Sequence, residues 1–135
     1  LDGSPLAEGI LAQVLALAGP FHASFILVQV IERPAYPMLD VSGVQTREAE
    51  EAIRYLDRIR GTVEAAGFRA LTEALFGEPA TAILAHAAKV EADVIAMSTH
   101  GRSGLNRWLL GSVAEKVLSG SEAPVLLYRA WTEAS

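Results

Sequence analysis

The amino-acid sequence predicts a single α/β domain built on an open sheet of parallel strands. The chain has 135 residues, close to the roughly 150 of one common domain. Its segments alternate between helical periodicity and short apolar runs, and each parallel strand needs a helix to return the chain to the next strand. Apolar residues make up 51% and charged residues 20%, a composition that fills a core and is unlike that of a disordered chain. We expect residues 1–135 to form one domain without an internal boundary.

The first helix and the first recognisable strand follow from local signals. Residues 6–18 carry apolar side chains at helical spacing, preceded by Ser4 as an N-cap and Pro5 at the first helical position. The Gly-Pro pair at 19–20 ends this helix. Residues 24–31, SFILVQVI, form a nearly continuous apolar run, which is typical of a parallel strand covered on both faces.

The rest of the chain continues the alternation. Residues 32–43 contain two prolines and are expected to form a loop, whereas residues 49–66 carry the periodicity of a long amphipathic helix. Residues 70–76 alternate moderately and predict an outer strand. The remaining predicted elements are a helix that starts at residues 77–79, a buried strand at 93–97, a helix from about 111 to 118 and a last strand at 124–129.

Charge and composition exclude several functional classes. The formal net charge of −5 is opposite in sign to what binding of a nucleic acid requires. No apolar run reaches the roughly 18 residues of a membrane span, and no signal peptide opens the chain, so we expect a cytoplasmic protein. The absence of cysteine excludes disulfides, thiolate metal sites and thiol nucleophiles. His22 and His86 lack metal-ligand spacing, and we assign no protein metal site.

A glycine-rich segment after the strand at 93–97 is the strongest candidate for chemistry. It reads STHGRSG over residues 98–104, and Gly111 with Ser112 then opens a helix. Glycines let backbone N–H groups approach a ligand closely, a helix N-terminus favours an anion, and Arg102 and Arg107 add positive charge. This chemistry suits a phosphate. The alternative is that the glycines only turn the chain, Ser112 only caps a helix and the arginines are solvated; local chemistry alone leaves the two interpretations balanced.

The spacing of this segment excludes two common nucleotide motifs. Neither a Walker A sequence nor the G-x-G-x-x-G dinucleotide fingerprint occurs. Residues 94–128, VIAMSTHGRSGLNRWLLGSVAEKVLSGSEAPVLLY, instead resemble the C-terminal half of the universal stress protein family. Nucleotide-binding members of that family carry G-x2-G-x9-G-(S/T), and this chain matches with Gly101, Gly111 and Ser112 but has Ser98 in place of the first glycine. The N-terminal LDGS and the run ILVQVIE also match, so the resemblance covers essentially the whole chain.

The resemblance implies a Rossmann-like fold in which five parallel strands have the order 3-2-1-4-5 and helices cover both faces. It also implies ATP bound where the strand order reverses. Asp2 is then expected to hydrogen-bond the nucleoside, Val30 to line the adenine pocket, and Met97 to lie near the ribose or adenine. The residues implied around the triphosphate are Gly101, Arg102, Gly104, Gly111 and Ser112.

These implied roles have simpler alternatives. Asp2 would also serve as a turn residue, and Val30 and Met97 as ordinary core residues. Ser98 is small and has a hydroxyl to offer, so we expect weakened or retained binding there rather than loss. A divalent ion such as Mg²⁺ would arrive bridging the phosphates and keep most of its waters.

Three functions are weighed, and an ATP-binding stress-response module ranks first. No glutamate or glutamine is evidently placed to orient a water, and the phosphate loop has no lysine, so we expect binding without efficient hydrolysis and assign no catalytic residue. A dimeric interaction protein that binds no nucleotide ranks second, supported by Ser98. An enzyme ranks third, either a slow ATPase or an adenylate-transferring relative. The second of these is disfavoured because residues 1–6 lack the S-G-G-x-D-S loop of such enzymes.

The resemblance also bears on assembly and on the start of the chain. The apolar last strand would lie at a sheet edge, which is a liability unless covered, so we expect a homodimer through this strand, with Trp108 as a candidate subunit contact. In the resembled order, Asp2 follows a first strand at the centre of the sheet. The 135 residues contain no such strand, and a gap would leave buried N–H and C=O groups unpaired. We therefore expect a strand upstream of Leu1.

Overall fold

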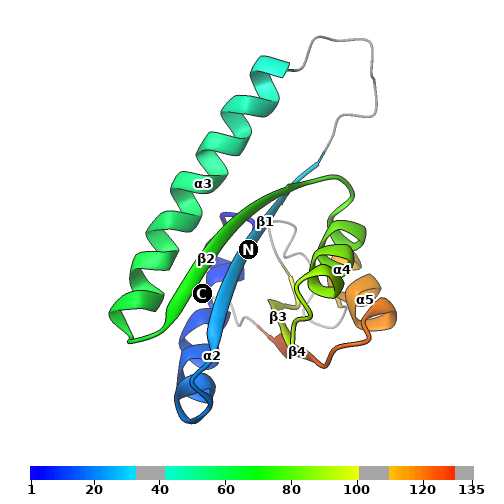
Figure 1. The fold of residues 1–135 in the computed structure, drawn as a ribbon. Coiled ribbons are helices and arrows are strands. Elements are labelled where there is room, and N and C mark those ends of the chain that lie inside the picture. Colours follow the sequence, from blue (N-terminus) through cyan, green and yellow to red (C-terminus); the bar gives the residue numbers. More distant parts are fainter. Residues whose placement is uncertain (33–41, 101–109, 130–135) are drawn as a thin grey trace, which may run out of the picture.

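The computed structural model describes residues 1–32, 42–100 and 110–129 and shows helices alternating with parallel strands (Figure 1). In chain order the elements are α1 (Pro5–Glu8), α2 (Ile10–Ala18), a 3-10 turn (Gly19–Phe21), β1 (Ser24–Ile31), α3 (Ser42–Ala65), β2 (Arg69–Phe76), α4 (Pro79–Lys89), β3 (Ile95–Ser98), α5 (Ser112–Gly120) and β4 (Val125–Tyr128). The α/β class predicted from the sequence is confirmed.

The described strands form two separate parallel pairs. β1 pairs with β2 over its full length, from Ser24 opposite Arg69 to Ile31 opposite Phe76. β3 pairs with β4 in the same way, and no ladder joins β1 to β3. The backbone nitrogen of Leu1 donates to the Val28 carbonyl at 3.2 Å, which places the first residues beside β1. In the five-stranded order 3-2-1-4-5, β1 and β3 correspond to strands 2 and 4, and strand 1 would lie between them. The described residues contain no strand at that place, so the five-stranded order stays a prediction.

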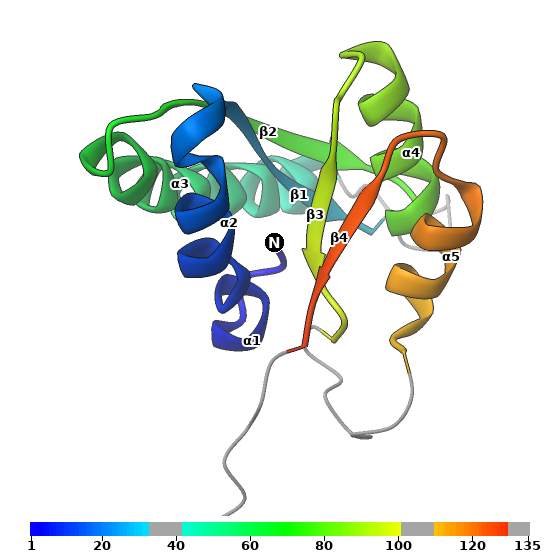
Figure 2. The same cartoon turned by 90° about the horizontal axis from the view of Figure 1, so that it is seen from below.

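Helices lie on both sides of these strands. α3 packs along β1 and β2 on one side, whereas α4 contacts the same pair from the other side and packs against α5 (Figure 1). A view from below shows α1 and α2 on one side of β3 and β4, with α4 and α5 on the opposite side (Figure 2). Helices therefore lie on both faces of the strands, as expected for continuous apolar strand sequences, although Leu71 of β2 stays 65% exposed.

The main core joins α3 to β1 and β2. The apolar stripe of α3 meets the strands at helical spacing, and Leu56 and Val63 at its centre are fully buried. Phe25 at the start of β1 packs edge-to-face on Phe68, with ring centroids 5.3 Å apart. The buried residues of this cluster are Leu27, Leu56, Ile59, Val63 and Ala70.

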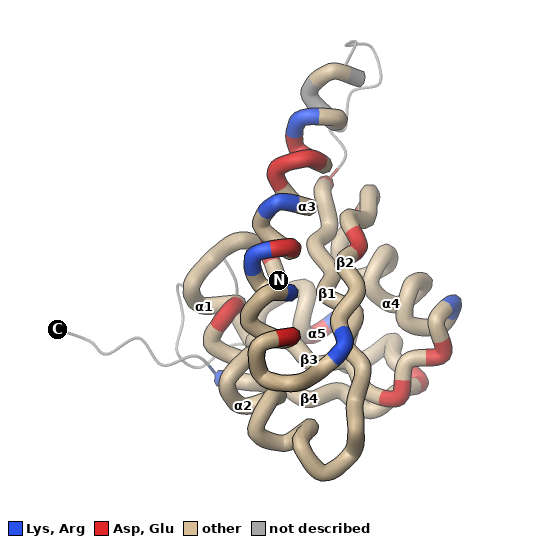
Figure 3. Tube along the Cα trace, turned by 60° about the vertical axis from the view of Figure 1, so that its left-hand side comes forward, with Lys and Arg blue, Asp and Glu red and all other residues tan. Residues whose placement is uncertain are grey.

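The opposite side of α3 is charged. Basic and acidic residues alternate along the helix in Figure 3, and Arg60 reaches both Asp57 at 3.4 Å and Glu64 at 3.8 Å. These side chains are 39% to 55% exposed, so water screens each pair and its contribution to the free energy of unfolding is small. None of the helices in the described ranges is long and apolar enough to cross a membrane.

Several element boundaries differ from the sequence predictions. The helix predicted over residues 6–18 is interrupted at Gly9, where the ring of Tyr128 approaches so closely that a Cβ would stand 2.9 Å from its Cε1 atom. β3 begins at Ile95 rather than at residue 93, because Ile95 is where the N–H first bonds across to Pro124. α3 begins at Ser42, seven residues before the predicted start at 49. Most of the loop predicted at 32–43, and Trp108, lie outside the described residues.

Candidate functional site

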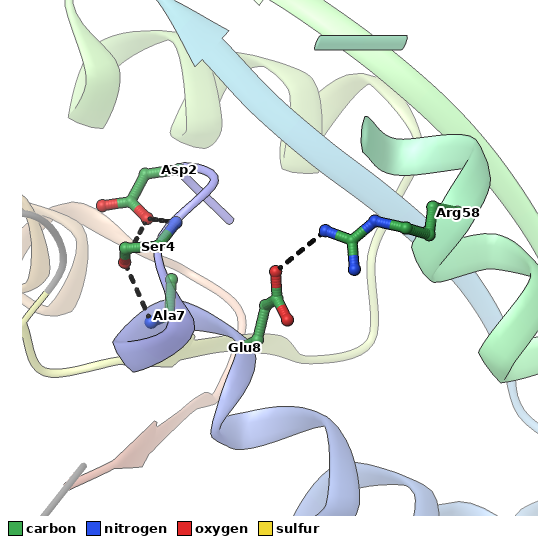
Figure 4. A network of polar contacts seen from close by, with 5 residues as sticks. All are labelled: Asp2, Ser4, Ala7, Glu8 and Arg58. Atoms are coloured by element: carbon green, nitrogen blue, oxygen red, sulfur yellow. Dashed lines mark hydrogen bonds and ion pairs between the residues drawn. The ribbon is translucent and has the colours of Figure 1, made fainter. Parts of the chain in front are cut away.

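The Asp2–Ser4 turn starts α1. The Oδ1 atom of Asp2 accepts the Ser4 backbone N–H at 2.9 Å and the Ser4 hydroxyl at 2.6 Å, and Gly3 takes a positive φ of 86° between them. The Ser4 Oγ in turn accepts the N–H of Ala7 at 3.2 Å, so Ser4 is the N-cap of α1 as predicted (Figure 4). Asp2 therefore has a structural role as a turn residue. A carboxylate offers about four lone-pair sites, so this role leaves it able to accept further bonds.

An ion pair that the sequence did not predict joins α1 to α3. The Nη2 atom of Arg58 lies 3.4 Å from the Oε1 atom of Glu8, at the end of α1 (Figure 4). The same guanidinium lies 5.3 Å from the ring centroid of Tyr55. Burial raises the pKa of the Tyr55 hydroxyl, and the Glu8 carboxylate beside it adds to that rise. Both effects favour the neutral hydroxyl of Tyr55 over its phenolate.

Ser98 ends β3 and turns its side chain toward α1. It is only 8% exposed, and its hydroxyl lies 3.1 Å from the carbonyl oxygens of both Leu6 and Ala7. From the sequence we expected this hydroxyl to be available to a ligand, whereas in the structure it donates to the backbone of α1. Val30 and Met97, the residues implied for the adenine side, are both half-buried near the carboxyl ends of β1 and β3.

Gly111 brings the N-terminus of α5 directly against the chain that leaves β3. Its N–H donates to the carbonyl of Thr99 at 2.9 Å, and a Cβ at this position would lie only 2.6 Å from that oxygen. No atom other than hydrogen fits there. Gly111 is the N-cap residue of α5 and supplies no side-chain cap, and Ser112 follows as an exposed first helical residue. Among the described residues no side chain caps this helix, and its first N–H groups and the positive end of the helix dipole together favour an anion.

α4 presents a different N-terminus. Glu78 caps it by accepting the Thr81 hydroxyl at 2.6 Å and the N–H groups of Thr81 and Ala80 at 2.8 and 3.3 Å. The hydrogen bond from the Thr81 hydroxyl, followed by the backbone bonds, lowers the pKa of Glu78 to about 2. Lys116 of α5 lies 3.5 Å from the same carboxylate. The N-terminus of α4 is therefore already occupied by a side-chain anion, in contrast to that of α5.

The described residues cover only part of the predicted site. They bring Asp2, Ser98 and Gly111 into one connected region at the start of α1 and α5, with Ser112 exposed beside them. Gly101, Arg102 and Gly104 lie outside the described residues, and their roles stay predictions. Across residues 1–32, 42–100 and 110–129, no cluster of three His, Asp or Glu side chains is arranged to hold a metal ion.

The fold and this arrangement define an α/β domain of parallel strands with an open helix N-terminus beyond the end of β3. Residues 1–129 match the model of the universal stress protein family, and the chain belongs to that family. The chain is 33% identical over 132 residues to universal stress protein MJ0531 of Methanocaldococcus jannaschii, covering 95% of this chain and 78% of that protein.

Solved structures give the same result for the fold. Hypothetical protein MJ0577, the subject of a structure-based assignment of function, superposes with a TM-score of 0.89 at 29% identity, covering 98% of this chain and 94% of its own. A universal stress protein in complex with cAMP gives 0.65 at 23% identity, covering 97% and 93%. One from Archaeoglobus fulgidus in complex with dAMP gives 0.66 at 19%, covering 94% and 90%. At the identities of the last two, the likeness shows the fold.

Proposed function

We propose that the chain is a cytoplasmic stress-response module that binds ATP, with Mg²⁺ bridging the phosphates, and does not hydrolyse it efficiently. The observation that carries this proposal is the uncapped N-terminus of α5, held against the end of β3 by the contact between Gly111 and Thr99. The space that a Cβ would fill at Gly111 is closed by the Thr99 carbonyl, so only glycine keeps this approach. An anion-binding helix N-terminus at the carboxyl end of a parallel strand is where nucleotide phosphates bind in such folds.

The nucleoside is assigned to the residues around the Asp2–Ser4 turn. Asp2 accepts a hydrogen bond from the nucleoside, Val30 lines the adenine pocket, and Met97 lies near the ribose or adenine. Two relatives of the same fold were solved with cAMP and with dAMP, and both ligands share the adenine base with ATP. This shared base supports an adenine nucleotide.

The phosphates are assigned to the α5 end of the site. The backbone amide of Ser112 and the exposed Ser112 hydroxyl bind the phosphate oxygens, whereas the N–H of Gly111 is used by the Thr99 carbonyl and Gly111 serves by allowing the close approach of α5. Gly101, Arg102 and Gly104 complete the phosphate site, with Arg102 supplying positive charge in a chain whose net charge is −5. Mg²⁺ would offset the charge of the phosphates and needs few protein ligands.

Hydrolysis requires a group that orients the attacking water, and we assign none. The test is to denature the purified protein, identify the released nucleotide chromatographically, and follow phosphate release from added ATP. The proposal expects an adenine nucleotide in the released fraction and phosphate release no faster than in a protein-free control. Release of a different class of ligand, or steady turnover that scales with protein concentration, would contradict it.

A homodimer through β4 is part of the same proposal. Along one edge β4 pairs with β3, and among the described residues no strand pairs with its other edge. Its four residues Val125–Tyr128 are all apolar or aromatic. A second copy pairing along that edge would cover it, which is how exposed edge strands are commonly protected.

A further inference from the structure

The two halves of the proposed nucleotide site are connected by an unbroken hydrogen-bonded path. Asp2 holds Ser4, and Ser4 caps α1 at Ala7. The carbonyl of Ala7 accepts the hydroxyl of Ser98 at 3.1 Å, and the residue after Ser98 accepts the N–H of Gly111 at 2.9 Å. The path therefore runs from the residue assigned to the nucleoside to the helix N-terminus assigned to the phosphates.

Ser98 is the residue that links α1 to β3 in this path. Its hydroxyl lies equally close, at 3.1 Å, to the Leu6 and Ala7 carbonyls, although Leu6 and Ala7 precede it by about 90 residues in the chain. Of the polar and charged residues in the described part of the chain, Ser98 is the one that is buried. A buried hydroxyl needs a partner, and this one takes carbonyls at the end of α1. A glycine at this position, as in the family motif, would have no hydroxyl to make the connection.

α1 needs such external support because it is only four residues long. A helix this short has too few internal hydrogen bonds to hold its own position. The Glu8–Arg58 ion pair ties it to α3, but that pair is largely exposed on the Arg58 side and is worth little by itself. Ser98 ties α1 to β3 through a buried contact, where hydrogen bonds are least screened by solvent.

We propose that Ser98 is a positioning residue that fixes the nucleoside half of the site relative to the phosphate half. This inference rests on the proposed function. Ser98 need not touch the ligand. It sets the distance between the Asp2 turn and the N-terminus of α5, a distance that matters to a ligand spanning both and not to one that binds either half alone. The serine thus compensates for the lost motif glycine by holding α1 against β3.

The test measures three probes by NMR or calorimetric titration: ATP with Mg²⁺, adenosine, and inorganic tripolyphosphate. Ser98→Ala and Ser98→Gly are each expected to weaken ATP binding about three- to tenfold, the effect of one intramolecular hydrogen bond. Adenosine and tripolyphosphate should change by less than about twofold. Ser121→Ala is the matched control, because it removes another serine hydroxyl that donates to a backbone carbonyl, that of Ala123 at 2.7 Å, at the opposite end of α5.

Two results would overturn the inference. If Ser98→Gly binds ATP as tightly as the unaltered protein or more tightly, Ser98 does not position the site. If all three probes weaken by the same factor, Ser98 contributes only general stability.

Hydrogen exchange of the α1 amides separates this inference from the proposed function. In Ser98→Ala, the N–H groups of Ala7 and Gly9 should exchange faster, whereas those in α4 should not change. If the unaltered protein binds none of the three probes, the proposed function is wrong. If the exchange rates of the α1 amides are unchanged in Ser98→Ala, the proposed link through Ser98 is wrong instead.

Discussion

The N–H of Gly111 donates to the carbonyl of Thr99 at 2.9 Å, and a Cβ on Gly111 would stand 2.6 Å from that oxygen. This contact sets the first turn of α5 directly beyond the end of β3. Because both partners are backbone atoms, neither can move aside to admit a side chain without displacing a helix or a strand.

The first prediction is that Gly111→Ala damages both the fold and the ligand site. The added methyl group must push α5 away from Thr99, at a cost of about 1–3 kcal/mol in the free energy of unfolding, as for other overpacked sites. ATP binding should fall at least tenfold, because the amides at the start of α5 move with the helix. Urea unfolding and calorimetry measure the two effects.

Gly61→Ala is the matched control for this substitution. Gly61 lies within α3 with no atom in reach of an added Cβ, so alanine there should leave ATP binding unchanged and stabilise the helix slightly. Equal ATP affinity in Gly111→Ala and the unaltered protein would show that the Gly111–Thr99 contact is not part of the site.

The second prediction concerns Glu78 and acid stability. Its pKa in the folded protein is lowered to about 2, chiefly by the Thr81 hydroxyl, from a usual value of 4.5. A lowered folded pKa means that the carboxylate stabilises the fold at pH values above 4.5 and loses that contribution as the pH falls from 4.5 towards 2. Glu78→Gln should therefore lower the urea midpoint at pH 6, and its difference from the unaltered protein should shrink by pH 3. Glu51→Gln, on α3, serves as the control, and a difference for Glu78→Gln that is constant with pH would refute the assignment.

The third prediction tests the core between α3 and the strands. Leu56 is fully buried, whereas Leu71 of β2 is 65% exposed. Leu56→Ala should lower the free energy of unfolding by about 2–5 kcal/mol because it opens a cavity. Leu71→Ala removes the same atoms from an exposed position and should cost less than about 1 kcal/mol. Equal losses in chemical denaturation would show that Leu56 is not at the centre of the core.

The fourth prediction concerns the homodimer. The carbonyls of Pro124 and Tyr128 accept bonds from β3, so the alternation of a parallel ladder directs the N–H of Leu127 to the opposite edge. Leu127→Pro removes that N–H without removing a bond to β3 and should convert a dimer to a monomer in light scattering. Leu127→Ala keeps the N–H and should stay dimeric. A dimer that survives Leu127→Pro would place the interface elsewhere.

The sequence predicted best what depends on local pattern. β1 was predicted with its observed bounds, because six of its eight residues are apolar and form a nearly continuous run that leaves few alternatives. The N-cap at Ser4 and the helix start at Pro79 were also predicted from local sequence signals, and both are confirmed. The close approach of the Tyr128 ring to Gly9, where the helix is interrupted, could not be predicted because Tyr128 comes from the far end of the chain.

The candidate site shows the same division. Its expected location after β3 and the role assigned to Gly111 come from glycine spacing and from the family resemblance, and both stay predictions. The partner of the Ser98 hydroxyl could not be predicted, since the spacing of a motif does not indicate which distant backbone oxygen a side chain will meet. The Glu8–Arg58 pair was missed for a similar reason, as charged residues on two amphipathic helices have many possible partners. A serine in place of a motif glycine was nevertheless a usable signal that this position needed a structural explanation.

Nucleotide binding is tested most directly by calorimetric titration of the intact protein with ATP and Mg²⁺. We expect a saturable heat with one ATP per chain, at a dissociation constant between micromolar and millimolar, and loss of that heat in Gly111→Ala. The absence of any heat over that range of ATP concentrations would contradict nucleotide binding and favour a dimeric interaction protein instead.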